Sequence, residues 1–185
     1  MKSRVVNLLR IAARVAATSV LETCLSNWPD KVPEVGALLG KGANGEVYDI
    51  GGGKTAKFSS AYQPAEDPVQ GSGIVKIHDV VNFGEANGRF YFMVIMDRLE
   101  PLSPEEADGA RYLPSLVAEA SGEDYTKYYG YDEETYPSHL DAPEAWKQLV
   151  QDWKNAGALD QVDIVAGAAN VMKDPEGNLV AVDVL

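Results

Sequence analysis

The stretch Gly40-Lys41-Gly42-Ala43-Asn44-Gly45-Glu46-Val47 decides how this chain is expected to fold. Its three glycines let the backbone turn sharply and bring N–H groups close to a polyphosphate. The spacing alone is weak evidence, because such loops occur in several structural settings. Residues 37–41 before it and 46–50 after it both read as strands, whereas a dinucleotide-binding loop leads into a helix. We therefore predict a strand–turn–strand loop that covers phosphates.

The residues that follow extend this hairpin into a small antiparallel sheet. Gly51-Gly52-Gly53 predicts a second turn into a third strand, residues 54–58. After a loop at 60–73, two more strands are expected at 74–81 and 89–96. Asn87-Gly88 joins them and predicts a hairpin, because both residues tolerate positive φ.

Two places on this sheet are candidate nucleotide contacts. Lys57 lies on the third strand, where its ammonium would sit under the glycine-rich loop beside phosphate oxygens. The alternative is an exposed lysine at a sheet edge. Residues 92–99 form an apolar strand that stops abruptly at charged residues. It could offer backbone groups to an adenine edge with Met96 packed behind it, and a plain core strand is an equally good interpretation.

The second half of the chain predicts helices followed by a short hairpin. Residues 101–141 are acidic and rich in tyrosine, and 105–120 are expected to be partly helical. Residues 143–156 are the clearest helix, with Asp141 as its expected N-cap and Gly157 at its end. Its apolar stripe is expected to be core, and consists of Trp146, Leu149, Val150 and Trp153.

The last two short strands, Asn170–Lys173 and Leu179–Val182, are joined by the turn sequence of residues 174–178. Asn170 opens the first strand and Asp183 follows the second, so a tight hairpin would bring them together. Amide and carboxylate oxygens are ligands that Mg²⁺ prefers. The pair therefore predicts a magnesium site, although an isolated Asn or Asp at a turn is usually structural.

Composition limits the classes of protein. The chain has 185 residues, is 45% hydrophobic and carries a net charge of −12, which argues against nucleic-acid binding through phosphates. Cys24 is the one cysteine, so no internal disulfide forms and a reducing cytoplasm fits. No apolar run is long enough to span a bilayer. Residues 4–26 predict an amphipathic helix, with a signal or transit peptide as the alternatives.

In this order of elements, residues 36–185 resemble the protein-kinase fold and look most like the small serine/threonine protein kinases carried by bacteriophages. The resemblance implies an α+β fold with a small antiparallel N-lobe sheet, at about 36–99, and a minimal, truncated helical C-lobe, at about 100–185. Residues 1–30 would be a helical extension and 31–185 the kinase-like domain. By this likeness, the nucleotide is covered by Gly40, Gly42, Gly45 and Val47. Lys57 binds the α- and β-phosphates, Met96 is the gatekeeper, Asp97 to Leu99 form the hinge, and Asn170 and Asp183 hold magnesium.

The sequence departs from the kinase pattern at several points. The catalytic Asp should precede the metal-binding Asn by five residues, but that position is Val165. The nearest acid is Asp163, seven residues before Asn170. The helix that supplies a glutamate partner for the lysine is almost absent, leaving Glu66 and Asp67 as candidates. No Phe-Gly follows Asp183, and there is no activation segment.

The resemblance implies an ATP- and Mg²⁺-dependent serine/threonine kinase that acts on host proteins, with Asp163 and Lys57 as catalytic residues. It would work in the cytoplasm, that of the host if the protein comes from a phage, with a protein substrate or partner and neither nucleic acid nor membrane. The departures favour an alternative, a pseudokinase that binds nucleotide or another protein. A third possibility, an unrelated nucleotide-binding fold, would require a helix directly after Gly45.

Overall fold

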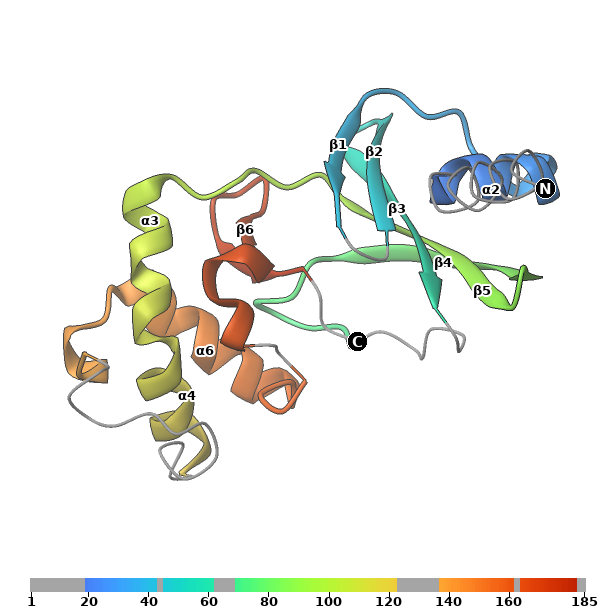
Figure 1. The fold of residues 1–185 in the computed structure, drawn as a ribbon. Helices are drawn as coiled ribbons and strands as arrows, with labels where there is room; N and C mark the ends of the chain where they lie inside the picture. Colours follow the sequence, from blue (N-terminus) through green and yellow to red (C-terminus); the bar gives the residue numbers. More distant parts are fainter. Residues whose placement is uncertain (1–18, 43–44, 62–68, 123–136, 162–163, 183–185) are drawn as a thin grey trace, which may run out of the picture. The chain divides into compact units, whose positions relative to one another are not determined.

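The computed structural model describes residues 19–42, 45–61, 69–122, 137–161 and 164–182. The chain divides into two compact units (Figure 1). Unit 1 comprises Met1–Pro64 with Asp79–Ile95, and unit 2 comprises Ala65–His78 with Met96–Leu185. Unit 1 is built on a sheet and unit 2 mainly on helices, so the fold is α+β as expected.

A five-stranded sheet has the order β1-β2-β3-β5-β4. The strands are β1 (Leu38–Lys41), β2 (Gly45–Gly51), β3 (Lys54–Ala61), β4 (Ile77–Ala86) and β5 (Arg89–Asp97). The predicted strands on both sides of the glycine-rich stretch are confirmed, since β1 pairs antiparallel with β2, and the third predicted strand is confirmed by the antiparallel pairing of β2 with β3. The fourth strand begins later than predicted, because Ile74 forms an isolated bridge with Ala181 instead.

Both predicted turns of the sheet are confirmed by their backbone angles. Gly51, Gly52 and Gly53 have φ of 76°, 62° and 73°, a region in which a side chain is strained. Asn87 and Gly88 have φ of 53° and 72° between β4 and β5. Two consecutive positive φ values match the right-handed twist of a two-residue hairpin.

The N-terminal helix packs on one face of the sheet. Helix α2 (Val20–Asn27) begins at the N-cap Ser19, which forms a capping box with Glu22, and a short 3-10 helix η1 (Pro29–Lys31) follows it. Leu21 and Cys24 are buried against the sheet residues Ala56, Phe58, Phe83, Tyr91 and Met93. Residues 4–18 of the predicted helix lie outside the described residues.

Unit 2 is held together by the helix that the apolar stripe predicted. Helix α6 (Glu144–Ala156) buries Trp146, Leu149, Val150 and Trp153. The Trp153 indole N–H donates to the Gly73 carbonyl at 2.8 Å, so this large side chain has a polar partner as well as apolar contacts. The other elements are α3 (Pro104–Asp108), η2 (Gly109–Tyr112), α4 (Leu113–Ser121), η3 (His139–Asp141), η4 (Ile164–Asn170), β6 (Val171–Lys173) and β7 (Leu179–Ala181).

Two local predictions in unit 2 are wrong. Asp141 does not cap α6, because it ends the 3-10 helix η3 and Pro143 occupies the N-cap position without a side-chain hydrogen bond. Asn170 ends η4 rather than opening β6. The partly helical segment and the terminal hairpin are confirmed, with β6 and β7 antiparallel. No helix in the described part of the chain is long and apolar enough to cross a lipid bilayer.

Candidate functional site

The glycine-rich loop and Lys57 share one face of the sheet in unit 1. In the register of the strands, Gly40 on β1 pairs with Val47 on β2, and Val47 pairs with Lys57 on β3. Paired residues on neighbouring strands point to the same side, and successive residues alternate. Since Phe58 packs toward α2, these three residues lie on the opposite face. The strand register therefore places Lys57 on the same face of the sheet as Gly40 of the glycine-rich loop, as predicted.

Phe92 and Val94 belong to this same face of the sheet. Their neighbours on β5, Tyr91 and Met93, pack in the core under α2, so alternation directs Phe92 and Val94 away from that helix. Both are buried. Phe92 and Val94 therefore lie on the face of the sheet that also carries Lys57.

The three glycines of the loop differ in what holds them. A Cβ on Gly45 would meet the Phe58 carbonyl oxygen at 2.7 Å and the Ser59 hydroxyl at 2.9 Å, so the close approach of β2 to β3 requires glycine there. At Gly40 and Gly42, an added Cβ would meet no described atom within 4 Å. Strand packing thus explains Gly45 alone, whereas the close approach of a ligand would require glycine at the other two positions.

Glu46 is a buried acid that the sequence analysis did not single out. Its side chain is 3% exposed, and Oε1 accepts a hydrogen bond from the Lys41 ammonium at 2.9 Å. Oε2 accepts from the Leu21 backbone N–H at 3.2 Å and from the Tyr48 hydroxyl at 3.3 Å. One carboxylate therefore connects the last residue of β1, the fourth residue of β2 and the first turn of α2.

The charges around Glu46 shift the pKa of several groups. Burial raises the pKa of Glu46, but hydrogen bonds from Lys41 and from the Leu21 N–H, with the charge of Lys41, outweigh it and leave the pKa below its ordinary value. The hydrogen bond to Glu46 and its negative charge raise the pKa of Lys41. Burial, with a smaller contribution from Glu46, raises the pKa of Cys24 to about 12. Glu46 is thus an anion at neutral pH, and the Cys24 thiol stays protonated.

A pattern in the sequence could have indicated Glu46. Alternation places it on the same side of β2 as Tyr48 and Ile50, both of which pack against the core under α2. An acid at an inward position needs partners, because an unpaired buried charge is very costly. The hydrogen bond from Leu21 joins residues 25 apart in sequence, and spacing alone does not reveal such a contact.

The predicted hinge segment is anchored in unit 2 at both ends. The Asp97 N–H donates to the Lys76 carbonyl at 3.1 Å, and its carboxylate lies 2.6 Å from Nε2 of His78. Glu100 and Lys173 exchange two backbone hydrogen bonds of 2.9 Å. Met96 is buried, and Leu99 lies between the two anchors. The N–H of Asp97 is therefore already engaged within unit 2.

The terminal hairpin brings the chain back to Asn170. The Val182 N–H donates to the Asn170 carbonyl at 3.0 Å, next to the pairing of Val171 with Ala181. The backbone thus reaches Asn170 one residue before Asp183, as the predicted magnesium pair requires. Asp183 itself lies outside the described residues. The amide oxygen of Asn170 fits Mg²⁺ by its chemistry.

Other predicted residues also fall outside the described part of the chain, namely Asp163, Glu66 and Asp67. Asp163 precedes Asn170 by seven residues, and the backbone bends at Gly167, within that interval, with φ of 55° and ψ of −132°. Among the described residues, no cluster of three or more His, Cys, Asp or Glu side chains is arranged to hold a metal ion.

The site was also compared with known proteins. No family model matches this chain, and no curated protein matches it.

Proposed function

We propose that this protein binds ATP with Mg²⁺ and transfers the γ-phosphoryl group to a serine or threonine hydroxyl of another protein. The observation that carries the proposal is the alignment of Gly40, Val47 and Lys57 across three strands, on the face opposite α2. A glycine-rich strand–turn–strand loop with a lysine on the next strand is the arrangement by which protein kinases hold ATP phosphates.

Each residue has a defined part in this proposal. Gly40 and Gly42 admit phosphate oxygens close to the backbone, and Lys57 neutralises the α- and β-phosphates. Val47, Phe92 and Val94 supply apolar surface for the adenine ring. Met96 is the gatekeeper, and the anchored segment Asp97 to Leu99 offers backbone groups to the adenine edge.

The transfer step needs little covalent participation from the protein. The acceptor hydroxyl oxygen bonds to the γ-phosphorus as the bond from that phosphorus to the β–γ bridging oxygen breaks, and ADP leaves. The hydroxyl proton passes to the carboxylate of Asp163. Asn170 and Asp183 would hold Mg²⁺, which would offset negative charge on the phosphates. Catalysis of this type rests mainly on positioning and electrostatics, so a small scaffold is sufficient.

A second candidate function is a pseudokinase that binds nucleotide without transfer. The kinase pattern places the catalytic Asp five residues before the metal-binding Asn, and that position is Val165 in this chain. The displacement of Asp163 from the usual position points the same way.

The experiment that tests the proposal combines thermal shift with phosphoryl transfer. MgATP at 100 times its Kd stabilises the native state by about 2.7 kcal/mol and raises the melting temperature. The full chain is compared with Lys57→Ala and with Lys54→Ala, a matched control on β3 three residues earlier. Only Lys57→Ala should lose the shift. Absence of any shift in the unmodified chain would overturn nucleotide binding altogether.

Transfer of labelled γ-phosphate to a protein mixture then separates the two candidates. Label from the unmodified chain that disappears in Asp183→Ala and Asp163→Asn supports the kinase. A clear thermal shift without label supports the pseudokinase. Equal label from all three proteins would show that the activity is a contaminant.

A further inference from the structure

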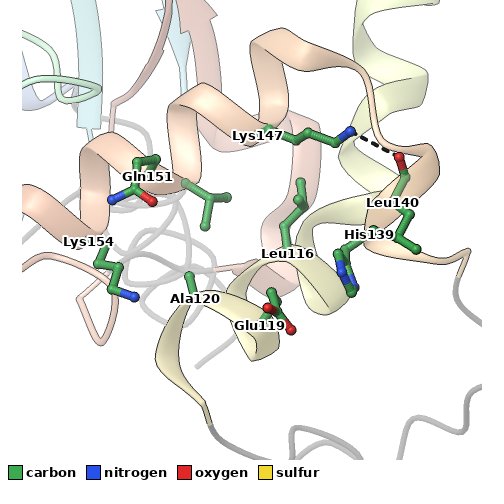
Figure 2. A pocket seen from close by; sticks show the side chains of 9 residues that line it. Leu116, Glu119, Ala120, His139, Leu140, Lys147, Gln151 and Lys154 are labelled. Atoms are coloured by element: carbon green, nitrogen blue, oxygen red, sulfur yellow. Dashed lines mark hydrogen bonds between the residues drawn. The ribbon is translucent and has the colours of Figure 1, made fainter.

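A hollow of about 380 Å³ lies in unit 2 between α4, η3 and α6 (Figure 2). This volume is within the range of small-ligand sites. Leu116 and Ala120 on α4 and Val150 on α6 give it an apolar floor. His139, Lys147 and Lys154 stand around that floor and offer N–H donors. The hollow is unrelated to the residues proposed for nucleotide binding.

The charge of this hollow is opposite to that of the unit that contains it. Unit 2 has 21 Asp and Glu residues against seven Lys and Arg. Two of those seven, Lys147 and Lys154, line the hollow, and Glu119 is the acid that lines it. Because the rest of the unit is so acidic, this is a place where an anionic group finds donors rather than repulsion.

The rim of the hollow also exposes an apolar side chain. Leu140 is 73% exposed, and the ammonium of Lys147 donates to its backbone carbonyl at 2.9 Å. This hydrogen bond fixes the short helix η3 against α6, so Leu140 is presented on an anchored segment (Figure 2). An occupant that covers Leu140 would remove apolar surface from water, which favours binding.

The spacing of the two lysines distinguishes among anionic occupants. Lys147 and Lys154 are seven residues apart on α6, or about 10 Å along the helix axis at 1.5 Å per residue. Figure 2 shows the two ammonium groups on opposite sides of the hollow, with that of Lys147 held at the Leu140 carbonyl, so an occupant with two separated anionic groups matches them better than a single phosphate or carboxylate does. On an extended peptide, side chains two residues apart share one face and start about 7 Å apart, so two flexible glutamate side chains at that spacing can reach both ammonium groups. Nucleic acid is disfavoured, because the acidic surroundings repel a long polyanion.

We propose that this hollow binds an acidic peptide segment of a partner protein. An apolar side chain of the peptide enters over Leu116 and Val150, and its carboxylates meet Lys147 and Lys154 on the α6 side. Glu119 on α4 repels a carboxylate at the other side and so sets the orientation of the peptide.

The test measures binding of a labelled peptide to the full chain by fluorescence anisotropy, without nucleotide. The probe is fluorescein-labelled Glu-Leu-Glu-Glu-Leu-Glu-Glu-Leu, and the control probe has the uncharged glutamine in place of each glutamate. Binding of the acidic probe should weaken as salt rises from about 0.05 M to about 0.5 M, since exposed ion pairs are screened. The glutamine probe should bind more weakly than the acidic probe at low salt, because it offers no carboxylates to Lys147 and Lys154.

Two pairs of variants localise the binding. Lys154→Glu should weaken binding of the acidic probe about three- to tenfold, because it replaces attraction with repulsion. Lys76→Glu makes an equal charge change at an exposed position elsewhere in unit 2, and should change the affinity less than about twofold. Leu140→Ser should weaken binding about two- to fivefold. Leu38→Ser, at a leucine that is 52% exposed in unit 1, should not.

Four results would overturn the proposal. They are no binding of the acidic probe, equal binding of the two probes, equal effects of Lys154→Glu and Lys76→Glu, and tighter binding of a DNA duplex than of the acidic peptide. Because no nucleotide is present, each of these results leaves the proposed kinase function untouched. Far-UV circular dichroism of each variant verifies that the fold is retained.

Discussion

Replacing Glu46 by alanine should lower the free energy of unfolding by about 2–3 kcal/mol, because it removes a charged acceptor that is almost fully buried. The carboxylate accepts from the Leu21 N–H at 3.2 Å, from Lys41 at 2.9 Å and from the Tyr48 hydroxyl at 3.3 Å. Its loss leaves a donor at the start of α2 without this partner, and hydrogen bonds to charged groups contribute about 1.5–3 kcal/mol each in net terms.

The two partners of this network should not contribute equally. The side chain of Lys41 is 62% exposed, against 3% for Glu46, so water replaces much of what the ammonium loses in Lys41→Ala. Lys41→Ala should therefore lower the free energy of unfolding much less than Glu46→Ala does. Glu46→Gln should fall between them, because the amide oxygen can still accept from Leu21 but carries no charge.

Urea unfolding followed by far-UV circular dichroism measures these differences. The midpoint should fall while the dependence on urea stays constant, which indicates a change in stability rather than in the unfolded state. If Lys41→Ala costs as much as Glu46→Ala, the exposed ion pair rather than the buried cap carries the energy, and the reasoning is refuted. A neutral Glu46→Ala would refute it as well.

Three further predictions concern the same unit. Because folding lowers the pKa of Glu46, its carboxylate stabilises the folded state at any pH above the ordinary pKa of about 4.3. This stabilisation is lost as the pH falls through the lower pKa of the folded state. The free energy of unfolding of Glu46→Gln should therefore depend less on pH in acid than that of the unmodified chain. Gly45→Ala should lower the melting temperature, because its Cβ would meet the Phe58 carbonyl oxygen at 2.7 Å. Gly40→Ala should leave the melting temperature unchanged and should only weaken the binding of ATP. Equal melting temperatures of the two variants would contradict this prediction. Burial raises the pKa of the Cys24 thiol to about 12, so the thiol should react with a reagent such as iodoacetamide only after unfolding in urea. Rapid labelling of the native chain at neutral pH would contradict the buried position.

The sheet could be predicted from sequence because its signals are local. Glycine runs and Asn87-Gly88 specify positive φ, and only a few residue types tolerate it. Helix α6 could be predicted equally well, because apolar residues that recur with a period of 3.6 over thirteen residues leave little doubt about a helix. In both cases, the residues that decide the structure are neighbours in the chain.

The errors occurred where a second structural element competes with a local sequence preference. Ile74 reads as the start of a strand, but its backbone pairs with Ala181, more than a hundred residues away. Asp141 is a good N-cap residue, yet the 3-10 helix η3 takes it and leaves Pro143 to begin α6. Glu46 was overlooked for the same reason, because its partner Leu21 belongs to another element.

The candidate site also shows why one short stretch of sequence can serve two purposes. Glu46 and Val47 are consecutive, so the pleat of β2 directs one toward α2 and the other toward the face of Lys57. Fixing the carboxylate of Glu46 at the first turn of α2 therefore also fixes the backbone that carries Val47 and ends the glycine-rich loop. A helix that covers one face of a sheet can in this way fix the conformation of the opposite face, which is then available to a ligand. The N-terminal helix thus acts as structural support for the glycine-rich loop.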